Sequence, residues 1–209
     1  AEPYLKELPI ESAAKIVSEM DSDDAVDVLE EMDATTKHKI VGMLDKEASD
    51  DVRLLFSYDD DEIGSRMTTN FIMIHNHLTI RQAMRELVEQ AGENDNISTI
   101  YVIDEEDKFY GAIDLKDLII AREYTDLEDI ISHSYPYVMD HEKVSDCIDK
   151  IRDYAEDSIP VLQENGTIAG IITSQDIVEA VDDEMGDDYA KLAGLTAEED
   201  LNETLPQSI

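Results

Sequence analysis

The residues best suited to chemistry in this sequence are carboxylates, and they gather in two stretches that contain no basic residue. One stretch covers residues 176–188, where seven of thirteen side chains are acidic. If it is helical, Asp176, Glu179 and Asp183 share one face, because side chains three or four positions apart are neighbours on a helix. The carboxylates of this stretch are Asp176, Glu179, Asp182, Asp183, Glu184, Asp187 and Asp188.

The other stretch covers residues 19–33 and holds eight carboxylates. Asp23 and Asp27 lie one helical turn apart in it, and Glu30 or Glu31 continues the same stripe. Exposed helices usually mix the two signs of charge, because like charges one turn apart repel each other. Two unmixed stripes therefore indicate that something else supplies positive charge.

Divalent cations are the first candidate for that charge. Carboxylate oxygens are the ligands that Mg²⁺ and Ca²⁺ prefer. The sequence contains no EF-hand loop, and a site made of one or two carboxylates with water molecules is typical of Mg²⁺. The alternative is an acidic surface that faces only water. The stripes predict Mg²⁺ binding and leave this alternative open.

A third motif, residues 170–176, has the pattern of a strand ending in Thr173 followed by a helix with Asp176 in its first turn. A hydroxyl and a carboxylate at the start of a helix could hold a ribose. The alternative is that Thr173 only caps the helix. An earlier copy of the motif covers 111–117, with Asp114 in place of the threonine.

Few other residues could carry chemistry. His75 and His77 have a spacing that can hold Zn²⁺, but the sequence offers no third ligand near them. Cys147 matches a core position of an earlier helix and is predicted to be buried. The sequence has no nucleophile elbow, P-loop or HExxH motif. We therefore predict that the chain is not an enzyme.

The overall charge restricts the partners that the chain can bind. Its 209 residues include 52 acidic and 16 basic side chains, a formal net charge of −36. Such a field repels phosphate, which argues against nucleic acids and anionic membrane surfaces. A hydrophobic content of 42% suffices for a folded core, and a single cysteine fits a reducing compartment. With no apolar run long enough to span a bilayer, we expect a soluble, intracellular chain.

The first sixty residues contain a repeat of twelve. Apolar residues recur at this interval, and an aspartate follows each repeat at Asp21, Asp33 and Asp45. The pattern predicts short helices, each begun by a polar cap. Helices this short cannot bury an apolar face alone, so they must stack into a superhelical array.

The next part of the chain is a duplication. Strands near 71–74, 100–103 and 110–113, with helices at 79–90 and 115–121, give the order β-α-β-β-α. Shifts of 59 to 64 residues superimpose this pattern on the segment that ends at Thr173. The sequence therefore predicts two related units side by side.

These two units, closed by the motif 170–176, resemble a tandem pair of CBS (cystathionine β-synthase) domains. With the helical array before them and the acidic stretch 176–188 after them, the chain resembles the cytosolic region of MgtE-type magnesium transporters or channels. The resemblance implies an α+β multidomain fold: an N-terminal all-helical superhelical array, the CBS pair and an acidic connecting helix. The expected divisions are a partial helical N domain at 1–66, CBS domains at 67–130 and 131–186, and a connecting segment at 187–209.

In that family, the resemblance implies, this region is a homodimeric Mg²⁺ sensor that dimerises through its CBS domains. Cations held between the helical domain, the CBS pair and the connecting helix favour a closed pore. The matching metal ligands here are Asp23, Asp27, Asp176, Glu179, Glu184, Asp187 and Asp188.

The resemblance also implies ATP as a further ligand. Lys116 and Asp117 match the residues that contact phosphate and ribose, whereas Thr99 stands where an aromatic ring stacks on the base.

The leading hypothesis is thus the cytosolic Mg²⁺-sensing region of a magnesium transporter or channel. The full-length protein would lie in the cell membrane, with a C-terminal transmembrane pore domain that this sequence does not contain. The alternative is a free-standing CBS pair that senses adenosine nucleotides and regulates a cytosolic enzyme. The acidic connecting helix favours the first hypothesis, because phosphate recognition would call for Arg or Lys there.

Overall fold

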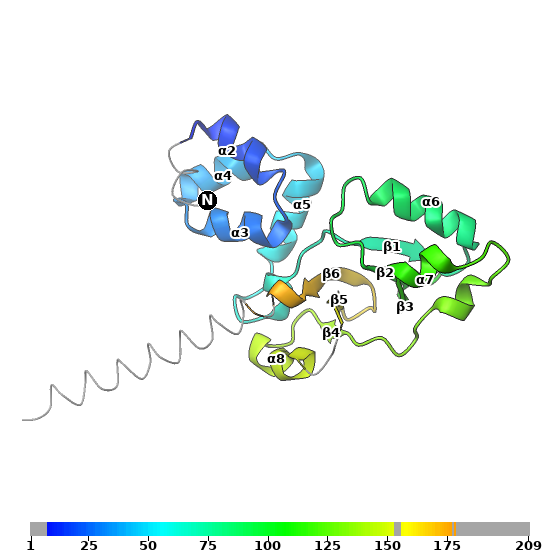
Figure 1. Cartoon of the computed structure of the whole chain (residues 1–209). Helices are drawn as coiled ribbons and strands as arrows, with labels where there is room; N and C mark the ends of the chain where they lie inside the picture. Colours follow the sequence, from blue (N-terminus) through cyan, green and yellow to red (C-terminus); the bar gives the residue numbers. More distant parts are fainter. Residues whose placement is uncertain (1–7, 153–155, 177, 179–209) are drawn as a thin grey trace, which may run out of the picture.

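The computed structural model describes residues 8–152, 156–176 and 178. A helical domain precedes two small β-sheets that carry their own helices (Figure 1). The helical domain consists of α2 (Ile10–Val17), α3 (Ser22–Glu30), α4 (Ala34–Val41) and α5 (Lys46–Leu55). Short helices at an interval of about twelve residues are what the repeat predicts, and α3 packs on α5 while α2 packs on α4.

The aspartates of the repeat begin helices, as predicted, but they do so in two ways. The carboxylate of Asp33 accepts hydrogen bonds from the backbone N–H groups at the start of α4, and that of Asp45 accepts one at the start of α5. Asp21 precedes α3 without a side-chain cap and instead accepts a hydrogen bond from Asn70 Nδ2 at 2.6 Å. Asp21 therefore links the helical domain to the segment that precedes β1.

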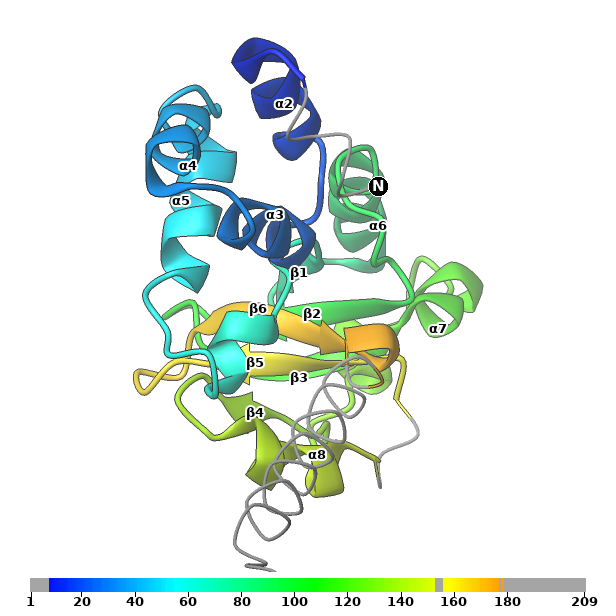
Figure 2. The same ribbon diagram turned by 90° about the vertical axis from the view of Figure 1, so that its left-hand side faces the viewer.

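The two β units have the same order of elements. The first contains β1 (Ile72–His75), α6 (Ile80–Gln90), β2 (Thr99–Ile103), β3 (Phe109–Asp114) and α7 (Leu115–Ile120). The second contains β4 (Val138–Met139), α8 (Val144–Arg152), β5 (Ser158–Leu162) and β6 (Ile168–Thr173), followed by a helix that begins at residue 174. Figure 2 shows the two sheets lying together beneath the helical domain.

The strand pairing confirms the duplication in detail. In each unit the first strand runs parallel to the second, and the second runs antiparallel to the third. The register slips after Val102 in the first sheet and after Val161 in the second, which are 59 residues apart, the shift that superimposes the two copies. The expected α+β architecture, a helical array followed by two β-α-β-β-α units, is therefore present.

The segment that precedes each unit, its lead-in segment, pairs with the last strand of the other unit. Thr68, which precedes the first unit, pairs with Ile171 of β6, and Ser132, which precedes the second, pairs with Ala112 of β3. A short 3₁₀ helix comes before each crossing segment: η1 (Ile63–Arg66) and η2 (Leu127–Ile130). The two β units are consequently interlocked rather than merely adjacent.

The buried core links the helical domain to the second β unit. One continuous apolar cluster runs from Leu29 and Leu55 of the helical domain, through Ile63 and Met67, to Ile172 of β6. The first β unit has a separate core that includes Ile113 and Leu118. The helical domain, although it immediately precedes the first unit in sequence, therefore rests on the second.

Candidate metal centre

The start of α3 is held against the segment that precedes β1. The backbone N–H of Thr69 donates to Ser22 Oγ at 2.9 Å, and the Thr69 hydroxyl donates to Asp51 Oδ2 at 2.8 Å. With the Asn70–Asp21 bond, these contacts fix the first turn of α3, which carries Asp23. The polar anchor and the buried core together set where this carboxylate lies.

Asp23 has an unsatisfied oxygen in a partly buried site. Its Oδ1 is buried and has no hydrogen-bond partner among the described residues. Burial, the charge of Asp176 and, to a smaller extent, the charge of Asp24 together raise the pKa of this carboxyl to about 7. An ionised carboxylate in this position is costly unless a cation neutralises it.

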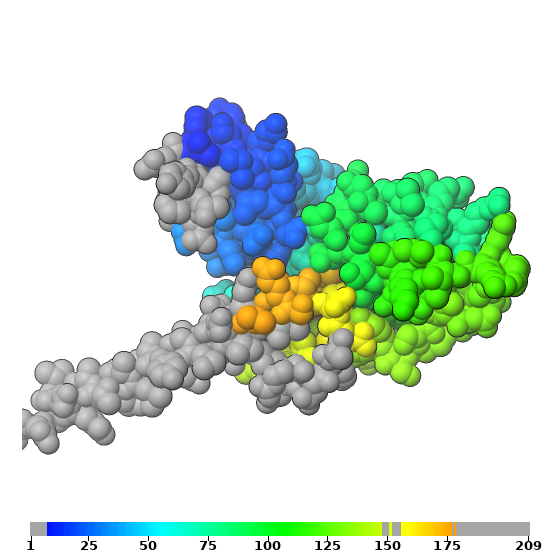
Figure 3. All heavy atoms as spheres, in the orientation of Figure 1, coloured from blue at the N-terminus to red at the C-terminus, as the bar shows by residue number. Residues whose placement is uncertain are grey.

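Asp176 comes from the far end of the chain. Its Oδ2 accepts hydrogen bonds from the backbone N–H of Thr173 at 2.7 Å and from the Thr173 hydroxyl at 2.8 Å. The predicted convergence of hydroxyl and carboxylate is thus present, and it caps the helix that follows β6. In Figure 3 the orange turn that contains Asp176 lies next to the blue helical domain.

The structure therefore brings two of the expected ligands, Asp23 and Asp176, into electrostatic contact across the domain boundary. Asp27 is exposed one turn further along α3 and lines a separate cavity of about 180 Å³ together with Glu30 and Arg66. Within the described ranges no group of three metal-binding side chains occurs. The remaining expected ligands lie outside the described residues: Glu179, Glu184, Asp187 and Asp188.

A second acidic hollow was not anticipated from the sequence. It has a volume of about 490 Å³ and lies between the helical domain and the loop after α6. Burial raises the pKa of Asp51 in its wall, so this carboxylate is also poorly solvated. The hollow forms where residues 47 to 49 positions apart come into contact, as in the Thr69–Ser22 and Asn70–Asp21 hydrogen bonds, and no local pattern indicates it. The acidic residues that line it are Glu19, Asp21, Asp45, Glu47, Asp51, Glu93 and Asp95.

The residues expected to contact ATP are only partly suited to it. Lys116 and Asp117 are exposed in the first turn of α7, where a phosphate and a ribose could reach them. Asp114 caps the same helix by accepting a hydrogen bond from the Lys116 N–H at 2.7 Å. Thr99 is buried in β2 at 9% exposure and offers no ring to stack on a base. The start of α7 is thus suited to phosphate and ribose, but Thr99 cannot stack on a base.

The minor candidates are structural. Cys147 is fully buried in the core, as predicted. His75 pairs with Asp107 at 3.3 Å and faces the ring of His77, which leaves two imidazoles and one carboxylate without the geometry of a metal site. Over the part of the chain that is described, no helix is both long enough and apolar enough to cross a bilayer.

Comparison with known proteins agrees with this architecture. The family model described as the MgtE intracellular N domain matches residues 1–61, and that of the CBS domain matches residues 61–124 and 127–183. A solved structure described as the soluble part of a magnesium transporter is 34% identical, covers 88% of this chain and 72% of that one, and superimposes with a TM-score of 0.82.

The chain belongs to the MgtE family.

Further MgtE relatives extend the match. The magnesium transporter MgtE of Enterococcus faecalis is 36% identical over 73% of this chain, and that of Thermus thermophilus is 29% identical over 82%. These matches cover 34% and 38% of the relatives, so the chain spans little more than a third of their length. The cytosolic domain of the Mg²⁺ channel MgtE in complex with ATP is 28% identical, covers 84% of this chain and 72% of that one, and has a TM-score of 0.77. These MgtE proteins are named as transporters or channels rather than enzymes.

Proposed function

We propose that this chain is the cytosolic Mg²⁺-sensing region of a magnesium transporter or channel. In this proposal Mg²⁺ binds between the helical domain and the second CBS unit and favours the closed state of the pore. The observation that carries it is the unsatisfied, buried Oδ1 of Asp23 in the electrostatic field of Asp176. Two carboxylates from different domains raise each other's cost of ionisation, and in this proposal a cation turns their repulsion into a bridge.

The chemistry of the two side chains suits a hydrated Mg²⁺ ion. Mg²⁺ binds through oxygen and commonly keeps several water molecules, so one or two carboxylates are enough. Such a site binds weakly, which a sensor of an abundant ion requires. We propose Asp27, Glu179, Glu184, Asp187 and Asp188 as further ligands, and we propose the domain divisions 1–66, 67–130, 131–186 and 187–209.

A double-mutant cycle tests the bridge. Asp23→Asn and Asp176→Asn should each lower Mg²⁺-dependent stability, and the double variant should lose less than the sum, with a coupling above about 0.5 kcal/mol. In EDTA the same two carboxylates repel each other, so Asp23→Asn should be stabilised relative to the parent and the coupling should reverse its sign. The measurement is the free energy of unfolding in EDTA and in millimolar Mg²⁺.

Asp24→Asn is the matched control, because it removes the same charge from an exposed neighbour on α3. It should show little coupling to Asp176→Asn in either condition. Additive effects of Asp23→Asn and Asp176→Asn in Mg²⁺ would mean two independent acidic surfaces, and the bridging mechanism would then be wrong.

ATP is a second proposed ligand, supported by the relative that was solved with ATP bound. Lys116 and Asp117 would contact its phosphate and ribose from the first turn of α7. The rival function, a free-standing nucleotide sensor, is less well supported, because the carboxylate of Asp23, whose pKa burial raises, lies in the electrostatic field of another carboxylate rather than of a basic side chain.

We also propose that the chain forms a homodimer through its CBS units. The packed helices α6 and α7 of the first unit and the residues just after them expose large apolar side chains: Val88, Ile119, Ile120 and Tyr124, which are 61–80% exposed. A second copy of the chain is the commonest partner for a self-complementary face of this kind.

Introducing a charge on this face should break the dimer. Ile120→Glu places a carboxylate where the proposed interface excludes water, so the dimer should weaken at least about tenfold. Sedimentation at tens of micromolar protein measures the change. Met43→Glu is the matched control, since Met43 is 52% exposed on the helical domain and should leave the dimer intact. A parent that sediments as a monomer, or equal effects of the two variants, would contradict this interface.

A further inference from the structure

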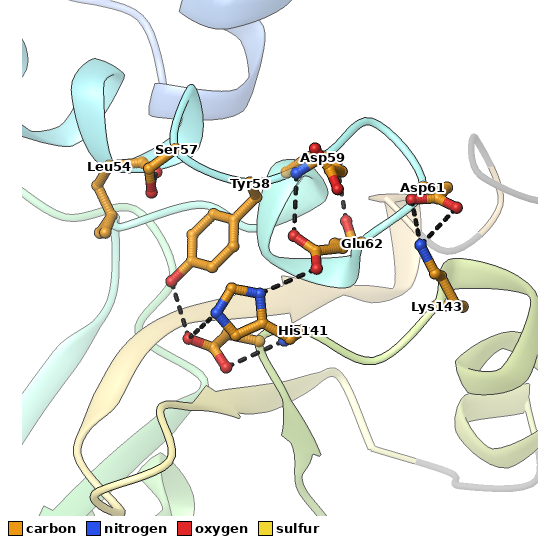
Figure 4. Close-up of polar contacts among 10 residues, drawn as sticks. Leu54, Ser57, Tyr58, Asp59, Asp61, Glu62, His141 and Lys143 are labelled. Atoms are coloured by element: carbon orange, nitrogen blue, oxygen red, sulfur yellow. Dashed lines mark hydrogen bonds and ion pairs between the residues drawn. The ribbon is translucent and has the colours of Figure 1, made fainter.

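A short segment after α5 is fastened to the turn between β4 and α8. Residues 58–66 leave the helical domain and run along residues 140–144 of the second β unit, some 80 positions later in the sequence (Figure 4). Backbone hydrogen bonds run in both directions between them: Ile63 N–H to the Glu142 carbonyl at 2.8 Å, Gly64 N–H to the Asp140 carbonyl at 2.9 Å and Val144 N–H to the Asp61 carbonyl at 2.9 Å.

A buried hydrogen bond closes the middle of this contact. The Tyr58 hydroxyl donates to Asp140 Oδ2 at 3.0 Å, and the two residues are only 8% and 5% exposed. Burial raises the pKa of Tyr58 to about 12, so the phenol keeps its proton at physiological pH. The ring also lies directly over Gly64, where any β-carbon would come within 2.8 Å of it. Tyr58 is thus held by both packing and a charged acceptor.

Ionisable groups surround this hydrogen bond on its exposed side. His141 Nδ1 lies 3.0 Å from Glu62 Oε1, and its Nε2 lies 4.0 Å from Asp140 Oδ2. The other oxygen of Glu62 accepts a hydrogen bond from the backbone N–H of Asp59. An ion pair between Lys143 and Asp61, at 2.6 Å, flanks the site. The groups that face His141 are therefore mainly carboxylates: Glu62 and Asp140, with Asp59 nearby.

Protonation of His141 favours the contact. The hydrogen bond to Glu62, followed by the charge of Asp140, raises the pKa of His141. The Asp59 N–H and His141 lower the pKa of Glu62. The contribution of His141 is therefore complete below its ordinary pKa near about 6.5 and is lost as the pH rises through its higher folded value. Glu62 stays ionised throughout that range.

We propose that residues 58–66 and 140–144 form a clasp that fastens the helical domain to the second CBS unit, and that protonation of His141 tightens it. The clasp would make the position of the helical domain sensitive to pH in the neutral range. It uses none of the proposed metal ligands, so it is independent of the Mg²⁺ hypothesis.

Hydrogen exchange of the full chain in EDTA tests the clasp. The backbone N–H groups of Ile63, Gly64 and Val144 cross it, so their protection, corrected for intrinsic exchange, reports its opening. We expect protection in the parent to be about two- to fivefold higher at about pH 6 than at about pH 8, as for an exposed ion pair. In His141→Gln, which keeps a polar side chain without the charge, this difference should vanish.

His133→Gln supplies the matched control, because His133 also pairs with a glutamate, Glu128, at 2.9 Å but lies away from the clasp. It should retain the difference seen in the parent. Tyr58→Phe should lower protection at both pH values by about tenfold and keep the ratio, since it removes a buried bond to a charged group. Equal protection of the parent at both pH values, an unchanged ratio in His141→Gln or unchanged protection in Tyr58→Phe would overturn the proposal.

Discussion

Asp23→Asn is expected to stabilise the metal-free protein by about 2 to 4 kcal/mol at about pH 8. The parent must hold an ionised carboxylate in a site that burial, Asp176 and Asp24 all make unfavourable, and one of its oxygens has no hydrogen-bond partner among the described residues. An amide of the same shape removes that charge. The pKa of Asp23 is raised to about 7 in the folded protein, whereas it is about 4 in the unfolded chain. Between these two pH values, folding therefore takes up a proton.

The gain should therefore depend on pH with a definite sign. The contribution of Asp23 to stability falls as the pH rises from about 4 to about 7 and is constant above that range. The difference between variant and parent should be small at about pH 5 and largest at about pH 8, measured by chemical denaturation in EDTA. Asp24→Asn should change stability by less than about 0.5 kcal/mol at both values. A destabilised Asp23→Asn variant in EDTA would contradict the buried-charge argument.

Gly111→Ala is expected to destabilise the protein by about 3 kcal/mol, through overpacking. The lead-in segment of the second unit crosses directly over this residue of β3. A β-carbon there would lie 2.7 Å from the Ser132 carbonyl oxygen and 2.6 Å from Ile131. The carbonyl belongs to a backbone that is hydrogen-bonded to Ala112, so it cannot move aside without breaking that pairing.

Gly92→Ala provides the comparison for this change. Its new β-carbon would meet only the Glu89 carbonyl oxygen at 3.8 Å, an ordinary contact distance. Thermal unfolding should show a clearly lower midpoint for Gly111→Ala and a midpoint near that of the parent for Gly92→Ala. If Gly111→Ala unfolds at the same temperature as the parent, the crossing of the two segments is looser than this structure indicates.

Local features of the fold were predictable because local sequence determines them. The helix predicted over 79–90 is present as α6, which begins at Ile80 after a capping box between Thr79 and Gln82. The strands predicted near 71–74, 100–103 and 110–113 lie within one or two positions of the observed bounds. The duplication was visible because both copies keep the same core positions, so Cys147 could be assigned to the core from its match to Ala83.

Long-range features of the site were only partly predictable. Charge patterning identified Asp23 and Asp176 as candidate ligands, but only the fold shows that they interact electrostatically while Asp27 lines another cavity. The clasp of Tyr58 with Asp140 joins residues 82 positions apart, and neither residue belongs to a local motif. Tertiary pairing decides such contacts, and a single sequence contains no periodic signal for them.

The placement of the helical domain on the second unit has a consequence for synthesis on the ribosome. Leu55, Ile63 and Met67 leave the ribosome early, yet part of their apolar contact surface is supplied by Ile159 and Ile172, about a hundred residues later. The main core of the first β unit comes from residues 72–131 and can form in the interval, whereas Tyr101 and Ala112 gain their contact with Ile171 only later. The nascent helical domain must therefore wait with an uncovered apolar edge until β6 emerges, a period of roughly 5 to 20 s at ordinary elongation rates. In the cell, this interval is when the chain is most exposed to chaperones and to misassembly.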